Sequence, residues 1–172
     1  FKSAMKAYYA KAGIKTARWH LVRDYTGCKD FIAEVGYPVI VKPDNGVGAS
    51  HTYKLKSEDE LNYFFATKDK TLYIMEEYVN GTVHTYDAII NSKGEPLFET
   101  GNVTMDSIMD IVNTRDNSCY YIEKNLPDAM RDIGRRTVAA FGVKSRFVHL
   151  EFFVLNEDQP ALGKKGDILG LE

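Results

Sequence analysis

The sequence lacks any apolar run long enough to form a transmembrane helix. No window approaches the roughly twenty consecutive apolar residues that a bilayer crossing needs. An excess of charge of either sign is also lacking, because the formal net charge is only −2. A balanced surface of this kind has no basic field that would attract nucleic acid or anionic lipid. We therefore expect neither a nucleic-acid partner nor a membrane partner.

Cysteine is scarce, and its two occurrences form no pattern. Cys28 and Cys119 lie far apart, form no CxxC pair and have no metal-ligand spacing. A disulfide between them is one interpretation. We favour two free thiols in a reducing, cytoplasmic compartment, where disulfides are rare.

The composition that remains is that of a globular protein, with 44% hydrophobic and 27% charged residues. Periodicity and boundary residues predict an α+β fold in which helices cover one side of mainly antiparallel sheets. A lobe boundary is expected near residues 79–81. The helices are predicted at residues 2–11, 28–35, 57–65 and 127–141. The strands are predicted at residues 17–21, 37–43, 52–55, 72–79, 83–90, 97–103, 147–155 and 168–171, and residues 105–121 are ambiguous.

A lysine follows the apolar strand at residues 37–43 and precedes a glycine-containing turn. Lys42 would have its base fixed by the strand, while Gly46 and Gly48 would let backbone N–H groups approach a phosphate closely. The GxxxxGK[ST] order of a Walker P-loop is absent. The pattern therefore indicates a phosphate contact, with a surface lysine before a hairpin turn as the alternative.

Two pairs of carboxylates lie near predicted strand ends. Glu76 and Glu77 lie at the end of one predicted strand, where an exposed backbone can offer one N–H and one C=O to the edge of a purine. The alternative is that both carboxylates are solvated. Glu151 and Glu172 lie in two later apolar runs. If those strands are neighbours, the two acids could share one face and bind Mg²⁺ together with phosphates. The alternative is a hairpin in which each acid faces water.

The other cations and histidines carry weaker signals. Lys164 and Lys165 lie in a loop and are either a mobile substrate clamp or surface charges. His84 and His149 are read as structural histidines, with ligand roles as the alternative. Most of the remaining cations are interpreted as solvated surface charges; they are Lys2, Arg135, Arg136 and Arg146.

The order of these elements resembles that of the ATP-grasp superfamily. The similarity is closest to biotin carboxylase, carbamoyl-phosphate synthetase and peptide-forming carboxylate–amine ligases, and it spans essentially the whole chain. Residues 37–50 are the most specific part. The stretches that carry it are residues 2–13 (KSAMKAYYAKAG), 37–50 (YPVIVKPDNGVGAS), 74–87 (IMEEYVNGTVHTYD) and 147–172 (FVHLEFF…GLE).

The resemblance implies a role for each matching position. Lys2 would contact phosphate from the first helix, and Lys42 would bridge the α- and β-phosphates. The resemblance also implies a flexible loop over the phosphates, formed by Gly46, Val47, Gly48, Ala49 and Ser50.

The adenine and metal contacts follow from the same match. Glu76, with the backbone of Glu77 and Val79, would form the adenine hinge. His84 falls near the ribose position. Glu151 and Glu172 would be the acidic ligands of Mg²⁺ or Mn²⁺.

The implied activity is an ADP-forming ligation, with ATP bound between two α+β lobes at residues 1–79 and 80–172. A small-molecule carboxylate would be activated as an acyl phosphate and attacked by an amine or, as a second choice, a thiol. No side chain is needed as a covalent nucleophile, and no Ser–His or Cys–His arrangement is evident. A homodimer is an allowed assembly. Two alternatives are a biotin-carboxylase-like enzyme using bicarbonate, and an ATP-binding module without catalysis.

The sequence departs from the family pattern at three places. The interval between Glu151 and Glu172 is about nine residues longer than the resemblance leads us to expect, which implies a longer hairpin loop. The chain stops before the asparagine and arginine that would follow Glu172. It also starts at Phe1 inside a predicted helix, so we expect the native N-terminus and an acceptor-binding lobe to lie upstream.

Overall fold

The computed structural model describes residues 1–46, 51–105 and 119–171. The chain divides into two compact units, each described here by itself. The first comprises Phe1–Ala4 and Ala17–Val79, and the second comprises Met5–Thr16 and Asn80–Glu172. Residues 5–16, which the sequence placed in the first lobe, thus belong to the second unit. Within the described residues, no helix combines the length and the apolar character that a membrane crossing requires.

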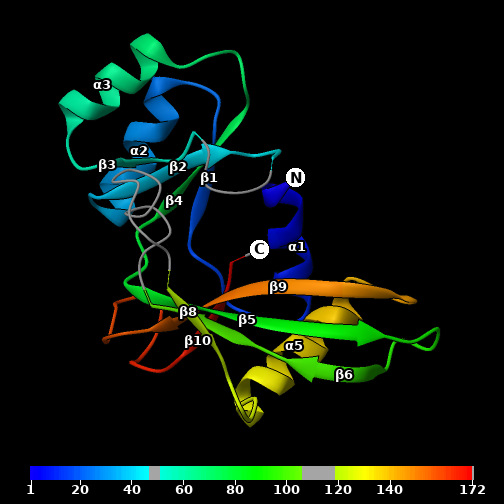
Figure 1. The fold of residues 1–172 in the computed structure, drawn as a ribbon. Coiled ribbons are helices and arrows are strands. Elements are labelled where there is room, and N and C mark those ends of the chain that lie inside the picture. Colours follow the sequence, from blue (N-terminus) through cyan, green and yellow to red (C-terminus); the bar gives the residue numbers. More distant parts are fainter. Residues whose placement is uncertain (47–50, 106–118, 172) are drawn as a thin grey trace. The chain divides into compact units, whose positions relative to one another are not determined.

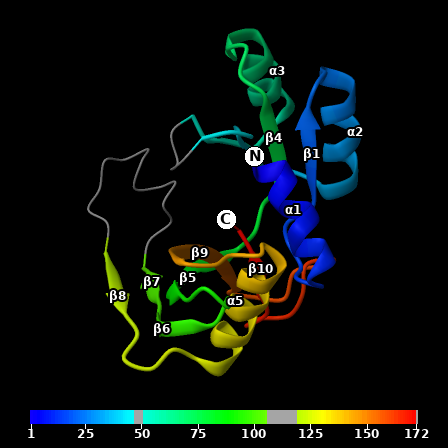
Figure 2. The same ribbon diagram turned by 90° about the vertical axis from the view of Figure 1, so that its right-hand side faces the viewer.

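The first unit is an antiparallel sheet covered by two helices. Its strand order is β1-β4-β2-β3. The helices α2 (Tyr25–Val35) and α3 (Glu58–Thr67) lie beside this sheet (Figures 1 and 2) and share one core with it, in which Val41, Phe64 and Tyr73 are buried. The strands are β1 (Trp19–Val22), β2 (Val39–Pro43), β3 (Tyr53–Leu55) and β4 (Tyr73–Glu77).

Side-chain caps set where these two helices begin. The Asp24 carboxylate accepts a hydrogen bond from the Gly27 N–H at 2.8 Å, so α2 begins earlier than the sequence predicted. Ser57 caps α3 as predicted, with its hydroxyl accepting from the Glu60 N–H. The Glu60 carboxylate accepts from the Lys56 N–H at 2.6 Å, one residue before the position expected of a capping box.

The second unit is built on a larger antiparallel sheet, of order β10-β9-β5-β7-β8, with β6 also paired to β5. The prediction of one continuous strand at residues 97–103 is wrong, because this segment forms two strands. It divides at Gly101, where an added Cβ would lie 2.4 Å from the Thr85 carbonyl oxygen. The strands are β5 (Gly81–Ile90), β6 (Pro96–Thr100), β7 (Asn102–Thr104), β8 (Tyr120–Ile122), β9 (Arg146–Leu155) and β10 (Ile168–Gly170).

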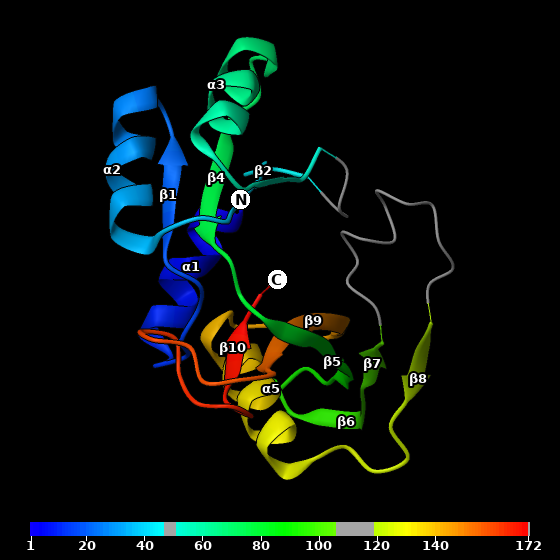
Figure 3. The same ribbon diagram turned by 90° about the vertical axis from the view of Figure 1, so that its left-hand side faces the viewer.

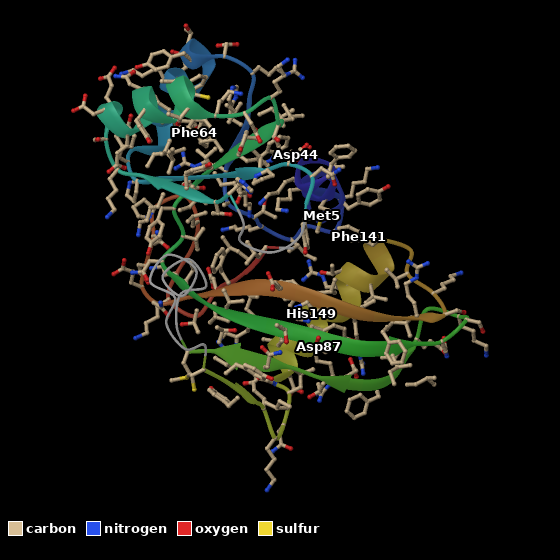
Figure 4. The ribbon with its side chains drawn as sticks, turned by 45° about the horizontal axis from the view of Figure 1, so that its top comes forward. Met5, Asp44, Phe64, Asp87, Phe141 and His149 are labelled. Carbon is tan, nitrogen blue, oxygen red and sulfur yellow. The ribbon has the colours of Figure 1, made fainter. Side chains whose placement is uncertain are left out.

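Helix α5 (Asp128–Ala140) packs on this sheet, as Figure 3 shows. Its Met130 and Ile133 join Tyr86 and Phe152 in one buried cluster. The part of α1 (Lys2–Lys11) that belongs to the second unit joins the same cluster through Tyr9; Figure 4 labels two more apolar residues packed against it, Met5 and Phe141.

The two cysteines are free, as predicted. Cys28 is fully buried in the core of the first unit, and burial raises the pKa of its thiol to about 11. Cys119 is exposed. A buried, protonated thiol contributes packing rather than reactivity.

The close packing of the Tyr86 ring against α5 predicts that adding one methyl group at Gly134 lowers the stability of the protein. A Cβ at Gly134 would lie 2.3 Å from the Tyr86 ring, and that ring is held in place because its hydroxyl donates to the Glu99 carboxylate at 2.7 Å. We expect Gly134→Ala to lower the free energy of unfolding by about 1–3 kcal/mol through overpacking, despite the better helix propensity of alanine.

Urea unfolding measures this effect. Asp132→Ala, at an exposed position of the same helix, is the matched control and should change stability by less than about 0.5 kcal/mol. A Gly134→Ala protein as stable as its parent would contradict the close packing of Tyr86 on α5.

Candidate functional site

A buried ion pair joins two neighbouring strands of the first unit. The Lys42 Nζ on β2 lies 2.8 Å from Glu76 Oε2 on β4, and their side chains are only 10% and 5% exposed. The alternatives of a surface lysine and a solvated Glu76 are therefore wrong. Charges so far from water are retained only with partners, because desolvating them is costly. By strand alternation, the pair lies on the sheet face opposite Val41 and Met75, which pack with the helices.

The segment after Lys42 is tied to the first turn of α1. The Asp44 carboxylate accepts from the Ser3 N–H at 2.7 Å and from the Ser3 hydroxyl at 2.8 Å. The buried Lys2 donates from Nζ to the Gly46 carbonyl at 3.0 Å. Gly46 has a φ of 146°, a conformation that favours glycine. Lys2 is thus attached to the start of the predicted phosphate loop, whose residues 47–50 lie outside the described residues.

Asp44, which makes this connection, was not identified from the sequence. An aspartate after Lys42-Pro43 was visible in the sequence, but its partner Ser3 is 41 positions away. The general preference of aspartate for helix N-termini gives the chemical reason for the contact.

Glu77, at the end of β4, is held by Arg18, which was not identified from the sequence. Arg18 donates to one Glu77 carboxylate oxygen from Nε at 2.9 Å and from Nη2 at 2.7 Å. A further bond of 3.2 Å joins Arg18 to Glu34 on α2. The Glu77 side chain is 7% exposed, so the solvated alternative is wrong for this carboxylate as well.

One face of the second sheet carries a line of polar side chains on β5 and β9. The register places Thr85 opposite Glu151 and Asp87 opposite His149. His149 Nδ1 lies 2.6 Å from Asp87 Oδ1, and its Nε2 lies 3.5 Å from Glu151 Oε1; Figure 4 shows Asp87 and His149 side by side. The Thr85 hydroxyl donates to Asp87 and accepts from the Asn102 N–H.

This network raises the pKa of the His149 imidazole. Partial burial lowers the pKa of the imidazole, but the hydrogen bond and charge of Asp87, helped by Glu151, outweigh it and raise the pKa above its usual value. Its predicted structural role stays an interpretation, now with an acidic partner on each side. Asp87 and Thr85 were not identified from the sequence.

Glu151 lies where β10 ends. The strands β9 and β10 are antiparallel neighbours, and the Leu171 N–H donates to the Glu151 carbonyl at 2.9 Å. Gly170 is required here, because an added Cβ would lie 2.7 Å from the Tyr9 ring. Glu172 lies outside the described residues, and the described ones contain no group of three or more His, Cys, Asp or Glu suited to a metal ion. The pairing of Glu151 with Glu172 therefore stays a prediction.

His84, Arg135 and Arg136 each lie against other side chains or backbone groups of the second unit. His84 lies on β5 opposite Phe152 and is half-buried; burial lowers the pKa of its imidazole, against a smaller opposing effect of Glu123. Arg135 pairs with Glu99 through two hydrogen bonds of 2.9 and 2.5 Å. Arg136 donates to the Ala12 carbonyl at 2.8 Å. These bonds connect α5 to β6 and to the residue that follows α1.

No protein-family model matches the sequence. Among curated proteins, D-alanine–D-alanine ligase A of Clostridium perfringens is 33% identical over 87 residues, which cover 46% of this chain and 28% of that protein.

Several solved structures share the fold. Carboxyaminoimidazole ribonucleotide synthase from Aspergillus clavatus, complexed with ATP, matches with a TM-score of 0.73 and 18% identity over 99% of this chain and 43% of that chain. D-alanine–D-alanine ligase from Bacillus anthracis, complexed with ATP, matches with a TM-score of 0.68 and 17% identity over 99% and 53%. The ATP-grasp ligase PsnB matches with a TM-score of 0.68 and 20% identity over 99% and 48%.

At these identities the structural likeness establishes the fold. The α+β architecture with two antiparallel sheets is the ATP-grasp fold, as the sequence predicted. The chain spans about half the length or less of the proteins that it matches.

Proposed function

We propose that this chain, which has the ATP-grasp fold, is the ATP-binding part of an ADP-forming ligase that activates a carboxylate for attack by an amine. The single observation that carries the proposal is the arrangement around Lys42. This lysine is buried at the end of β2, and the segment that follows it is bonded to a second buried lysine, Lys2. Similarity to ligases and to ATP-complexed structures supports the same conclusion.

Each group in the first unit has a chemical role in this proposal. Lys42 and Lys2 would neutralise phosphate oxygens, and the loop that includes Gly46 would supply backbone N–H groups. The Glu77 carbonyl and the Val79 N–H would bind the adenine edge. Groups fixed in advance by a sheet and a helix lose little freedom on binding, which favours affinity.

Glu151 on the second sheet fits a Mg²⁺ or Mn²⁺ site in its chemistry. It is a carboxylate on a rigid strand, and its side chain is 27% exposed, so its oxygens can be reached by a hydrated ion and phosphates. Hard oxygen ligands suit these ions. We propose Glu151 and Glu172 as the protein ligands. Such an ion, when bound, neutralises charge on the transferred phosphoryl group.

The proposed reaction has two steps. An oxygen of the substrate carboxylate attacks the γ-phosphorus of ATP, the bond to the β-phosphate oxygen breaks, and ADP leaves. The amine nitrogen then attacks the acyl carbon, phosphate leaves with the bonding electrons, and the amine loses a proton. The protein contributes positioning and charge neutralisation, so no covalent enzyme intermediate is needed.

Trapping with hydroxylamine tests this reaction in the protein that contains this chain. A panel of small carboxylates is supplied with ATP and Mg²⁺, and hydroxylamine converts an acyl phosphate into a stable hydroxamate. We expect ADP and hydroxamate in equal amounts with a suitable carboxylate. Formation of AMP and pyrophosphate would instead indicate an acyl adenylate and would contradict the proposal.

A further inference from the structure

We propose that Arg18 is a positioning residue for base recognition, which sets the preference of the site for adenine. The inference rests on the proposed function, because it concerns how the end of β4 would bind the base of ATP. Arg18 would not touch the nucleotide. It would act through Glu77, by fixing the backbone groups that follow β4.

Arg18 is bonded to Glu77 through both its main chain and its side chain. The Glu77 N–H donates to the Arg18 carbonyl at 3.0 Å, and the Arg18 N–H donates to Glu77 Oε1 at 2.6 Å. The guanidinium completes the contact with two bonds to Oε2. Such a charge-assisted fork fixes both the position and the orientation of the carboxylate.

The pattern differs from a regular antiparallel ladder in one informative way. In a hydrogen-bonded antiparallel pair, each residue donates its N–H to the carbonyl of the other. Here the Arg18 N–H donates to the Glu77 carboxylate instead. Among the described residues, no backbone hydrogen bond runs from the Arg18 N–H to the Glu77 carbonyl. The carboxylate thus takes the place of the carbonyl, which is left available as an acceptor at the end of β4.

A donor lies two residues further along the chain. The Val79 N–H makes no backbone hydrogen bond to another described residue, although the residue is only 6% exposed. Buried N–H groups generally have partners. An acceptor at Glu77 and a donor at Val79 complement adenine, whose 6-amino group donates and whose N1 accepts. Hypoxanthine presents the reverse pattern, with a 6-oxo acceptor and an N1–H donor.

The test compares three ligands: ATP, ITP and inorganic tripolyphosphate, which has no base. Each is titrated against the parent and against Arg18→Lys, which keeps the charge but loses the fork, and Glu77→Gln, which keeps the shape but loses the charge. Arg23→Lys, at an exposed position, is the matched control. Thermal unfolding confirms that each variant is folded.

We expect the parent and the control to bind ATP more tightly than ITP. In Arg18→Lys and Glu77→Gln this preference should fall by about tenfold, the effect of one weakened hydrogen bond to the base, with tripolyphosphate affinity unchanged within about twofold. An equal loss for all three ligands, or an unchanged ATP-to-ITP ratio, would overturn the inference. A parent that binds none of them would instead refute the proposed function.

Discussion

Replacing Lys42 with methionine is expected to weaken ATP binding by about 1.5–3 kcal/mol, the scale of a charge-assisted hydrogen bond. The same change should lower the free energy of unfolding by about 3–5 kcal/mol, because the Glu76 carboxylate would remain in the interior without the ammonium 2.8 Å away. Calorimetric titration with ATP and urea unfolding measure the two effects.

A double variant separates the two effects. Lys42→Met/Glu76→Leu removes both charges, and replacing a buried ion pair by apolar residues is often nearly neutral for stability. We expect it to regain most of the lost stability without regaining affinity for ATP. If Lys42→Met binds ATP as tightly as the parent, Lys42 does not belong to the nucleotide site.

Replacing Glu151 with glutamine is expected to abolish most of the gain in ATP affinity that Mg²⁺ produces. The amide keeps the shape of the side chain but removes the charge that a hard cation requires. The loss should be at least roughly tenfold, since removing even an outer-shell partner of a metal ligand has effects of that size. Titration of ATP with and without Mg²⁺ measures it.

The matched control for this variant is Glu157→Gln, which removes the same charge from an exposed loop position. It should leave the effect of Mg²⁺ unchanged. If both variants lose the Mg²⁺ effect equally, net charge rather than ligation explains it. If neither loses it, Glu151 is not a metal ligand.

The elements that could be predicted from sequence are those whose signals are local. The helix at residues 2–11 matches α1, Ser57 caps α3, and the β-branched run before Lys42 forms β2. Periodicity and caps act over a few residues, so one sequence is enough to recognise them. The division at Gly101 was missed because it depends on the close approach of the Thr85 carbonyl.

The contacts that complete the candidate site could not be predicted, because they join distant positions. Arg18 and Glu77 are 59 residues apart, and His149 and Asp87 are 62 apart. Each pair depends on strand order and register, which a single sequence does not specify. The burial of Lys42 and Glu76 could not be predicted either. Lysine and glutamate are usually surface residues, and only the pairing of β2 with β4 places these two together in the interior.

Titration of the chain with ATP, with and without Mg²⁺, tests the central claim most directly. We expect saturable binding of one ATP per chain, strengthened by Mg²⁺ in the parent. In the Glu151→Gln/Glu172→Gln double variant, Mg²⁺ should not strengthen the binding of ATP. A folded parent that shows no saturable binding of ATP in either condition would contradict the claim that this chain forms a nucleotide site.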